Sequence, residues 1–234
     1  MQAVIIVAGG SGTRMGTAVP KQFLPIGGKP VLMHTLDRFH AYDEQMQLVL
    51  VLPATQHDYW RKLCENCHYE LASRLTLATG GDSRFQSVKN GLACVHPEAT
   101  LIGVHDGVRP FVSLDVIANC YQAAAQTGAA IPVTDVVETL RQLCPEGGST
   151  TVPRTNYRLV QTPQVFHATL LREAYLQTFS SQFTDDASVV ESWLSIHPST
   201  YSLSLVDGNR ENIKITTPFD LTVAQSYVCK EKCE

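Results

Sequence analysis

The strongest constraint on the fold is a regular alternation of short apolar runs with segments of helical periodicity. The runs are rich in leucine and β-branched residues and contain no charged side chain: Ala3–Ala8, Leu48–Leu52, Leu75–Ala78 and Leu101–Val104. Such runs are typical of parallel strands buried on both faces of a sheet. The alternation therefore predicts an α/β fold, with a doubly wound, mostly parallel sheet and helices on both of its faces.

Helical periodicity between the runs comes from apolar residues three or four positions apart. These residues form three faces: Val31, Leu32, Leu36 and Phe39; then Val88, Leu92 and Val95; then Val116, Ile117, Cys120 and Tyr121. Ser83 and Gln86, which precede the second face, match a capping box and predict a helix start.

The alternation breaks between residues 130 and 161. Strands are predicted at Ala130–Val133, Val136–Leu140, Thr150–Val152 and Tyr157–Val160, with a turn at Cys144–Gly148. An excursion over 135–161 is too short to form a domain of its own. We therefore expect a single domain over 1–234 that carries a protruding β-arm.

Regular elements resume after the arm. The sequence predicts helices at His167–Thr178 and Asp185–Leu194, the second capped by Thr184. A strand at Tyr201–Val206 follows, and a last helix starts at Thr217-Pro218, with threonine as N-cap and proline in the first turn.

Composition and charge exclude several classes of function. The 234 residues are 44% hydrophobic and 17% charged, an ordinary globular balance, and the formal net charge of −4 argues against a nucleic-acid partner. An anionic ligand must therefore meet local positive charge. No apolar run approaches the roughly 20 residues of a membrane span, and the start lacks the features of a signal peptide. We expect a cytoplasmic protein without a membrane partner.

The strongest local signal for function is the glycine-rich segment Gly9–Gly16, directly after the first predicted strand. Glycines let backbone N–H groups converge on phosphate oxygens, and open α/β sheets bind ligands at this end of a strand. The segment fits neither the Rossmann fingerprint nor the Walker A motif. Two nearby cations, Arg14 and Lys21, suit a triphosphate whose α-phosphorus is attacked, because they stabilise charge in the transition state. The alternative is a plain strand-to-helix turn with two solvated cations.

Gly9–Gly16 and the following Pro20–Phe23 resemble the signature of the nucleotide-sugar pyrophosphorylases. More narrowly, they resemble the cytidylyltransferases of the methylerythritol phosphate route to isoprenoids. Further segments follow in the family's order, and the resemblance covers essentially the whole chain: Gly80–Arg84, Ser87-Val88, His105–Pro110, Thr162–Gln164, Thr184–Ser188 and Asn212–Thr216. It implies a Rossmann-like nucleotidyltransferase that joins CTP to 2-C-methyl-D-erythritol 4-phosphate and releases pyrophosphate.

The resemblance also implies roles for residues at the nucleotide. Arg14 and Lys21 would hold the triphosphate and stabilise the pentacoordinate phosphorus. Cytosine, ribose and the adjoining phosphates would meet a second set of residues, several of them through the backbone: Ala8, Gly9, Gly10, Gly80, Asp82 and Ser87.

For the second substrate, the resemblance places Arg109, Thr162 and Lys214 against the methylerythritol phosphate. Asp106 would lie near Mg²⁺ and the ribose or substrate. Arg154, on the β-arm, would reach into the partner subunit's site and position the attacking phosphate. This arrangement implies a homodimer with clasped arms, in which Arg154 and Lys214 join the catalytic residues.

The implied chemistry needs no general base, because the attacking phosphate oxygen is already anionic. Positioning, cations and a divalent metal ion bridging phosphates should dominate instead. Mg²⁺ needs only one or two protein carboxylates, since it keeps waters and phosphate ligands. We therefore expect His105, the residue before Asp106, to be structural.

Most of these residues also have a structural interpretation. Asp106 and Arg109 could form an ion pair within a surface turn, Lys214 could extend to solvent, and Asp82 could cap a turn. Thr184–Ser188 can be interpreted as an ordinary helix start.

Two regions depart from the family's usual pattern. Val136 and Glu138 stand where threonine and lysine are common, and Pro153 and Thr155 where aspartate and asparagine are frequent. These departures concern the second substrate, so ribitol-5-phosphate cytidylyltransferase is an alternative. Others are a cytidylyltransferase for acidic sugars, a uridylyltransferase and a non-catalytic nucleotide-binding domain.

The seven cysteines suggest free thiols, because their number is odd and they are scattered. Cys64–His68 matches the C-x-x-C-H pattern of haem attachment, and Cys64 and Cys67 could join Cys229 and Cys233 in a zinc site. Chance spacing on a helix and at the tail is the favoured interpretation.

Overall fold

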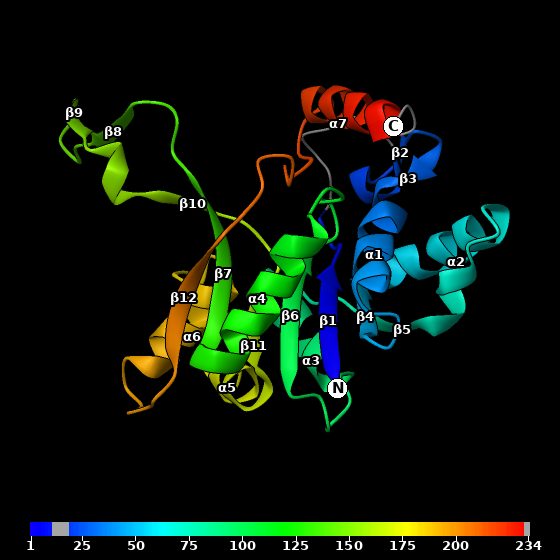
Figure 1. Cartoon of the computed structure of the whole chain (residues 1–234), viewed down its shortest axis with the longest axis horizontal. Coiled ribbons are helices and arrows are strands. Elements are labelled where there is room, and N and C mark those ends of the chain that lie inside the picture. Colours follow the sequence, from blue (N-terminus) through cyan, green and yellow to red (C-terminus); the bar gives the residue numbers. More distant parts are fainter. Residues whose placement is uncertain (11–18, 232–234) are drawn as a thin grey trace.

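A mixed eight-stranded sheet forms the middle layer of the computed structural model, which describes residues 1–10 and 19–231 (Figure 1). Across the sheet the strands are β10 (Arg158–Val160), β7 (Gly128–Asp135), β11 (Gln164–His167), β6 (Leu101–Asp106), β1 (Gln2–Val7), β4 (Gln47–Leu52) and β5 (Leu75–Thr79), and β12 (Ser202–Asp207) pairs with β7. Strands β6, β1, β4 and β5 are parallel, as are β7 and β12. Strand β11 runs antiparallel to both β6 and β7. The mostly parallel sheet predicted from the sequence is confirmed.

Both faces of β1, β4 and β6 are buried, which explains the apolar runs in their sequences. In β1, Val4 and Ile6 belong to one core cluster, whereas Ala3 and Ile5 belong to the other, and all four side chains are fully buried. Successive side chains of a strand point to opposite faces, so a strand covered on both sides needs an apolar residue at every position.

Helices cover the two faces in separate groups (Figure 1). One core cluster includes side chains of α1 (Val31–Tyr42), α2 (His57–Asn66) and α4 (Leu114–Thr127). The cluster on the other face includes side chains of α3 (Arg84–Ala93), α5 (Ala168–Ala174) and α6 (Asp186–Leu194). This is the doubly wound arrangement that the alternation of strands and helices predicts.

The last helix lies apart from both groups, beside a small hairpin (Figure 1). Helix α7 (Pro218–Glu231) contacts β2 (Pro25–Ile26), which pairs with β3 (Lys29–Pro30). Ile26 and Val228 share a third apolar cluster with Val108 and Ile215. The helix thus packs against segments that adjoin the end of β6. Short 3-10 helices complete the described chain: η2 (Lys21–Phe23), η3 (Ala54–Gln56), η4 (Glu70–Arg74) and η5 (Arg154–Asn156).

A hairpin of β8 (Leu140–Leu143) and β9 (Ser149–Val152) stands away from the body (Figure 1). A protruding arm was predicted here, but the strand predicted at Val136–Leu140 is wrong. Strand β7 ends at Asp135, where its pairing with Arg158 of β10 also ends. Beyond that pair the chain leaves the sheet, so the apolar residues Val136 and Val137 form no strand.

Two further predictions need correction. The helix predicted at His167–Thr178 spans only Ala168–Ala174. Helix α6 is capped by Asp185, not by Thr184. The Asp185 carboxylate accepts the N–H of Ser188 at 2.9 Å, and the Ser188 hydroxyl accepts the N–H of Asp185 at 3.2 Å. This reciprocal box satisfies two amide groups at once, which the Thr184 side chain does not do here.

Among the described helices, none combines the length and apolar character that crossing a lipid bilayer requires.

Candidate active site

A cavity of about 330 Å³ opens at the carboxyl edge of the central strands. Strands β1 and β6 end side by side there, with Val7 paired to Asp106. The lining combines the end of β1 with the two glycines that follow it, η2, the start of α3, the end of β6 and a segment before α7: Val7, Ala8, Gly9, Gly10, Lys21, Gln22, Gly81, Asp82, Ser83, Arg84, Ser87, Asp106, Val108 and Lys214. Eight residues predicted to form the site therefore meet in one place.

Asp106 is paired with two cations in the wall of this cavity. Its Oδ2 accepts a hydrogen bond from Arg109 Nε at 2.9 Å and lies 3.1 Å from Lys214 Nζ. Burial alone would raise the pKa of Asp106, but Lys214 and Arg109 hold that pKa below its usual value. The pairing of Asp106 and Arg109 is thus buried rather than part of a surface turn, and Lys214 bends toward the carboxylate.

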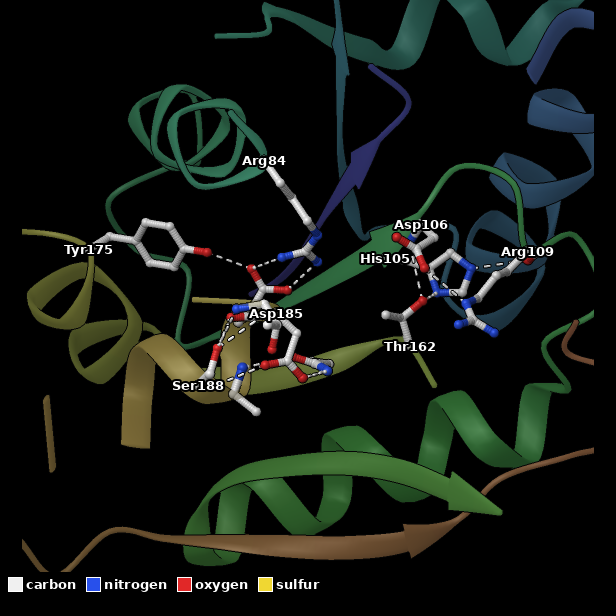
Figure 2. A network of polar contacts seen from close by, with 12 residues as sticks. Arg84, His105, Asp106, Arg109, Thr162, Tyr175, Asp185 and Ser188 are labelled. Carbon is white, nitrogen blue, oxygen red and sulfur yellow. Dashed lines mark hydrogen bonds and ion pairs between the residues drawn. The ribbon is translucent and has the colours of Figure 1, made fainter. Parts of the chain in front are cut away.

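Beneath Asp106, His105 and Thr162 form a chain of hydrogen bonds (Figure 2). Burial lowers the pKa of His105 to about 4, so its ring is neutral. The carbonyl oxygen of Arg109 can only accept, so Nε2 donates to it at 3.1 Å. Nδ1 then accepts from the Thr162 hydroxyl at 3.0 Å, whose oxygen accepts the N–H of Asp106 at 3.1 Å. The chain fixes the backbone of Asp106, which agrees with a structural role for His105.

The residues directly after β1 lie close to η2. Gln22 is buried, and its side-chain amide donates to the carbonyl oxygen of Ala8 and to Gln56 Oε1, both at 2.8 Å. A Cβ added at Gly10 would lie 3.7 Å from Cε of Lys21. These contacts bring Lys21, only 8% exposed, to the backbone of Gly10.

The start of α3 forms another wall. Ser83 caps the helix by accepting the N–H of Gln86 at 3.0 Å, and the Ser87 hydroxyl accepts the N–H of Gly81 at 3.0 Å. A Cβ at Gly81 would lie 2.3 Å from the side chain of Gln86, so the tight approach requires glycine. Asp82, which the sequence left open as a turn cap, lines the cavity instead, since the helix cap is Ser83.

The remaining predicted residues lie elsewhere. Gly80 lies behind the wall, with its N–H bonded to the carbonyl oxygen of Leu52 at 2.8 Å. Thr162 is buried, and a direct contact with substrate stays a prediction. Arg109 lines a neighbouring hollow of about 410 Å³. Arg154 lies on the arm, where its guanidinium donates to the carbonyl oxygen of Val137. Arg14 lies outside the described residues.

Sequence reasoning missed one part of this wall. Arg84 of α3 forms an ion pair with Asp186 of α6, and the two residues lie in the motifs Gly80–Arg84 and Thr184–Ser188. The motifs themselves were the only available signal. The two residues are 102 positions apart, so only the fold reveals that they meet.

A hollow of about 800 Å³ along α2 is larger than the cavity but contains none of the predicted site residues, so volume alone does not identify the site. Cys64 lines it, whereas Cys67 does not. Burial raises the pKa of Cys64 to about 12, and Cys67 is exposed. Within 1–10 and 19–231, no three His, Cys, Asp or Glu side chains are grouped to bind a metal ion. Cys233, the last member of the hypothetical zinc site, lies outside those residues.

Comparison with known proteins links this geometry to one family. The family model for 2-C-methyl-D-erythritol 4-phosphate cytidylyltransferase matches residues 2–230. The enzyme of that name from Phocaeicola vulgatus is 60% identical over 96% of this chain and 98% of the relative. The Bacteroides thetaiotaomicron enzyme is 58% identical over 97% of this chain and 99% of the relative.

Solved structures agree. 4-Diphosphocytidyl-2C-methyl-D-erythritol synthase from Anaerococcus prevotii superposes with a TM-score of 0.80 at 28% identity, covering 97% of this chain and 96% of that one. The Thermus thermophilus cytidylyltransferase gives a TM-score of 0.73 at 32% identity, covering 98% and 100%. These names favour methylerythritol phosphate over the ribitol phosphate alternative and an enzyme over a binding domain. The chain belongs to the 2-C-methyl-D-erythritol 4-phosphate cytidylyltransferase family.

Proposed function

We propose that the cavity at the ends of β1 and β6 is where this cytidylyltransferase joins CTP to 2-C-methyl-D-erythritol 4-phosphate. The observation that supports this site most is the convergence of Lys21, Asp106 and Lys214 with the backbone of Gly9 and Gly10. A phosphate oxygen of the methylerythritol substrate attacks the α-phosphorus of CTP and forms a new P–O bond. The bond from that phosphorus to pyrophosphate breaks, and pyrophosphate takes the electron pair. CDP-methylerythritol, an isoprenoid precursor, is the other product.

In this assignment the two substrates bind against opposite walls of the cavity. CTP lies along the glycine loop and the start of α3, where Gly10, Lys21 and Ser87 contact it. The methylerythritol phosphate lies at the end of β6, where Lys214 and Arg109 attract its phosphate. Both groups are held by cations that are already in position, so the protein reorganises little as charge builds on the α-phosphate.

A divalent cation, Mg²⁺ by its preference for oxygen, fits at Asp106. The Oδ2 of Asp106 is engaged by Arg109 and Lys214, whereas Oδ1 has no hydrogen bond to any residue within the described ranges. The side chain is 11% exposed at the cavity. One carboxylate oxygen suffices for Mg²⁺, since water and phosphate supply its other ligands. When bound, the ion neutralises charge on the phosphates.

The functional unit is a homodimer of single-domain subunits joined through their arms. Apolar side chains near the arm are exposed in one subunit, with Leu143 79% exposed, Leu159 52% and Val137 51%. Apolar surface of this kind is typical of protein interfaces. Arg154 lies outside its own cavity, which supports a role for the partner subunit's Arg154 in positioning the attacking phosphate. The cytoplasmic location stays a prediction that cell fractionation can test.

Pyrophosphate release tests the proposal directly. The purified protein is given CTP and Mg²⁺ with either methylerythritol phosphate or ribitol 5-phosphate. UTP in place of CTP checks base selectivity, and EDTA checks the metal. We expect release with CTP and methylerythritol phosphate, lost on chelation and restored by Mg²⁺. Loss of activity in Lys21→Ala and Lys214→Ala, with full activity in Lys29→Ala, assigns it to this cavity. Full activity in all three variants would place the reaction elsewhere.

A further inference from the structure

A buried ion pair joins Arg84, which lines the cavity and is labelled in Figure 2, to Asp186 of α6, a helix that contributes no residue to the lining. Arg84 is the first residue of α3, and Asp186 is the first residue of α6. Arg84 Nη1 donates to Asp186 Oδ1 at 3.0 Å and Nη2 to Oδ2 at 2.5 Å. The Tyr175 hydroxyl donates to Oδ1 at 2.6 Å. Asp186 is fully buried, whereas the Arg84 side chain is 31% exposed and lines the cavity.

The geometry leaves donors of Arg84 for a ligand. A guanidinium has five N–H groups, and Asp186 takes two of them, one from each terminal nitrogen. The Nε–H and the second N–H of each terminal nitrogen have no hydrogen bond to any residue described here. The carboxylate fixes the plane of the guanidinium, so these groups have a fixed direction.

Charge indicates which part of the ligand these donors suit. Burial alone would lower the pKa of Arg84, but Asp186 raises it above its usual value, so the side chain stays a donor. The pair as a whole is neutral. By contrast, Asp106 is outnumbered by Arg109 and Lys214, which gives the end of β6 a net positive charge. A neutral pair attracts phosphate weakly but can donate to neutral oxygens such as a ribose hydroxyl or the carbonyl of a pyrimidine.

We propose that Asp186 is a positioning residue of the nucleotide site: it holds Arg84 so that the remaining N–H groups donate to neutral oxygens of the cytidine part of CTP. The inference rests on the proposed assignment of the cavity to CTP. It gives the start of α6, which the sequence presented as an ordinary helix start, a part in nucleotide recognition.

Holding α6 in place does not require this ion pair. Gln164 of β11 donates to Asp185 Oδ2 at 2.8 Å and accepts the N–H of Ala187 at 2.8 Å. The capping box of Asp185 and Ser188 closes the same turn. A buried ion pair often stabilises a fold no more than packed apolar side chains, so stability alone does not account for the pair.

The experiment compares Asp186→Asn, Arg84→Gln and the double variant by calorimetry, with CTP and with CMP as probes. Asp186→Asn keeps the shape of the side chain but removes the charge that orients Arg84. We expect each single variant to lower the affinity for CTP and for CMP by the same factor, about tenfold, because each loses a directed hydrogen bond. The nucleotide affinity of the double variant should be no lower than that of Arg84→Gln, because Asp186 acts through Arg84. The KM for methylerythritol phosphate should stay unchanged.

Asp185→Asn is the matched control, since it weakens the cap of α6 and leaves the ion pair intact. It should lower Tm without changing nucleotide affinity. If Asp186→Asn does not fold, Arg84→Gln and Tyr175→Phe are measured in its place. Both variants must then lower the affinity for CTP and for CMP by the same factor.

Three outcomes would overturn the inference. The first is unchanged affinity in the folded variants. The second is a lower affinity for CTP with an unchanged affinity for CMP, which would mean that Arg84 contacts the β- or γ-phosphate. The third is additive losses in the double variant. Asp82→Ala separates this result from failure of the cavity assignment. If Asp82→Ala lowers the affinity for CTP and Asp186→Asn does not, only the inference about Asp186 fails. If neither variant lowers that affinity, the assignment of the cavity to CTP fails too.

Discussion

At the scale of single residues, the site is a balance of charges around one carboxylate. Asp106 draws Arg109 and Lys214 to within 3.1 Å and holds them while the cavity is open to solvent. Cations fixed in this way stabilise a transition state without first having to move. The carboxylate anchors the two side chains, and in the proposed function it would also supply an oxygen ligand for a metal ion.

Replacing Lys21 tests the part of the cations in turnover. Lys21→Ala should lower kcat on the order of 10²-fold, as removal of a donor from the developing charge does in other enzymes. Its KM for methylerythritol phosphate should change little. Steady-state pyrophosphate release measures both constants. Lys29→Ala is the control, because that side chain, on β3, pairs with Asp37 of α1 and does not line the cavity. A normal kcat in Lys21→Ala would disprove a role in the transition state.

The buried His105 predicts a pH dependence of stability. Its pKa falls from 6.5 to about 4 on folding, so the unfolded chain takes up the proton first. The native state thus has the full contribution above pH 6.5 and loses it as the pH falls toward 4, by about 3 kcal/mol in total. Urea unfolding between pH 4 and 7 measures the slope.

His105→Gln is the comparison for this slope. Its amide can donate to the Arg109 carbonyl and accept from Thr162, but it does not titrate. The variant should therefore unfold with a shallower dependence on pH over the same window. Parallel slopes for the two proteins would show that His105 is not the group responsible.

The sequence predicted the residues of this site unequally well. Lys21, Asp82 and Lys214 belong to motifs whose order along the chain matches a family, and all three line the cavity. The partnership of Arg84 with Asp186 was not predictable, because no periodicity relates residues 102 positions apart. Local patterns report which groups are present, whereas the pairing depends on how α3 and α6 pack.

At the scale of elements, helix starts do much of the positioning. Ser83 caps α3 at the cavity, and Ser113 caps α4 by accepting the N–H of Val116 at 3.2 Å. The two serines cap their helices with the same kind of hydrogen bond, but only Ser83 lies at the cavity. They allow stability and binding to be separated experimentally.

Both caps should contribute similarly to stability. Ser83→Ala and Ser113→Ala should each lower the free energy of unfolding by about 1 kcal/mol, as loss of an N-cap does. Only Ser83→Ala should also raise the KM for CTP, since the first turn of α3 forms the wall that carries Asp82 and Ser87. Chemical unfolding and steady-state kinetics on the two variants check this. An equal rise in KM for both would argue against a specific role for α3.

Elements were predictable where burial alone determines them. Strands β1, β4, β5 and β6 agree with the predicted apolar runs to within about two residues at each end, because β1, β4 and β6 are buried on both faces and β5 is half-buried. The arm was less predictable. Val136 and Val137 are apolar, yet no strand lies beside them after Asp135. A strand needs a partner for its backbone, and apolar side chains alone do not supply one.

At the scale of the whole molecule, the proposed homodimer has a site that is shared between two subunits through the arm. Arg154→Ala should weaken the binding of methylerythritol phosphate much more than the binding of CTP, because the partner subunit's Arg154 is proposed to contact only methylerythritol phosphate. A rise in KM of roughly tenfold for that substrate corresponds to one lost charged contact. Matched KM measurements for both substrates decide this, and an equal effect on CTP would contradict it.

Mixing variants tests the sharing itself. Arg154→Ala and Lys21→Ala subunits, each nearly inactive alone, are combined, unfolded and refolded together. Random pairing makes half of the dimers mixed, and each mixed dimer has one intact site, so about a quarter of the wild-type activity should return. Each variant refolded alone provides the baseline. Activity no higher than this baseline would show that each subunit acts with its own residues.

The cavity draws its cations from distant parts of the chain, with Lys21 before the first helix and Lys214 just before the last. This has a consequence for synthesis on the ribosome. The glycine loop and the strands that carry it emerge early, but Lys214 and the helix packed on the β2–β3 hairpin emerge late. A nascent or prematurely terminated chain that stops short of Lys214 lacks the side chain that, with Arg109, holds the end of β6. If Lys214 has its proposed role, such a fragment should not consume CTP, and turnover should begin only when translation is nearly finished.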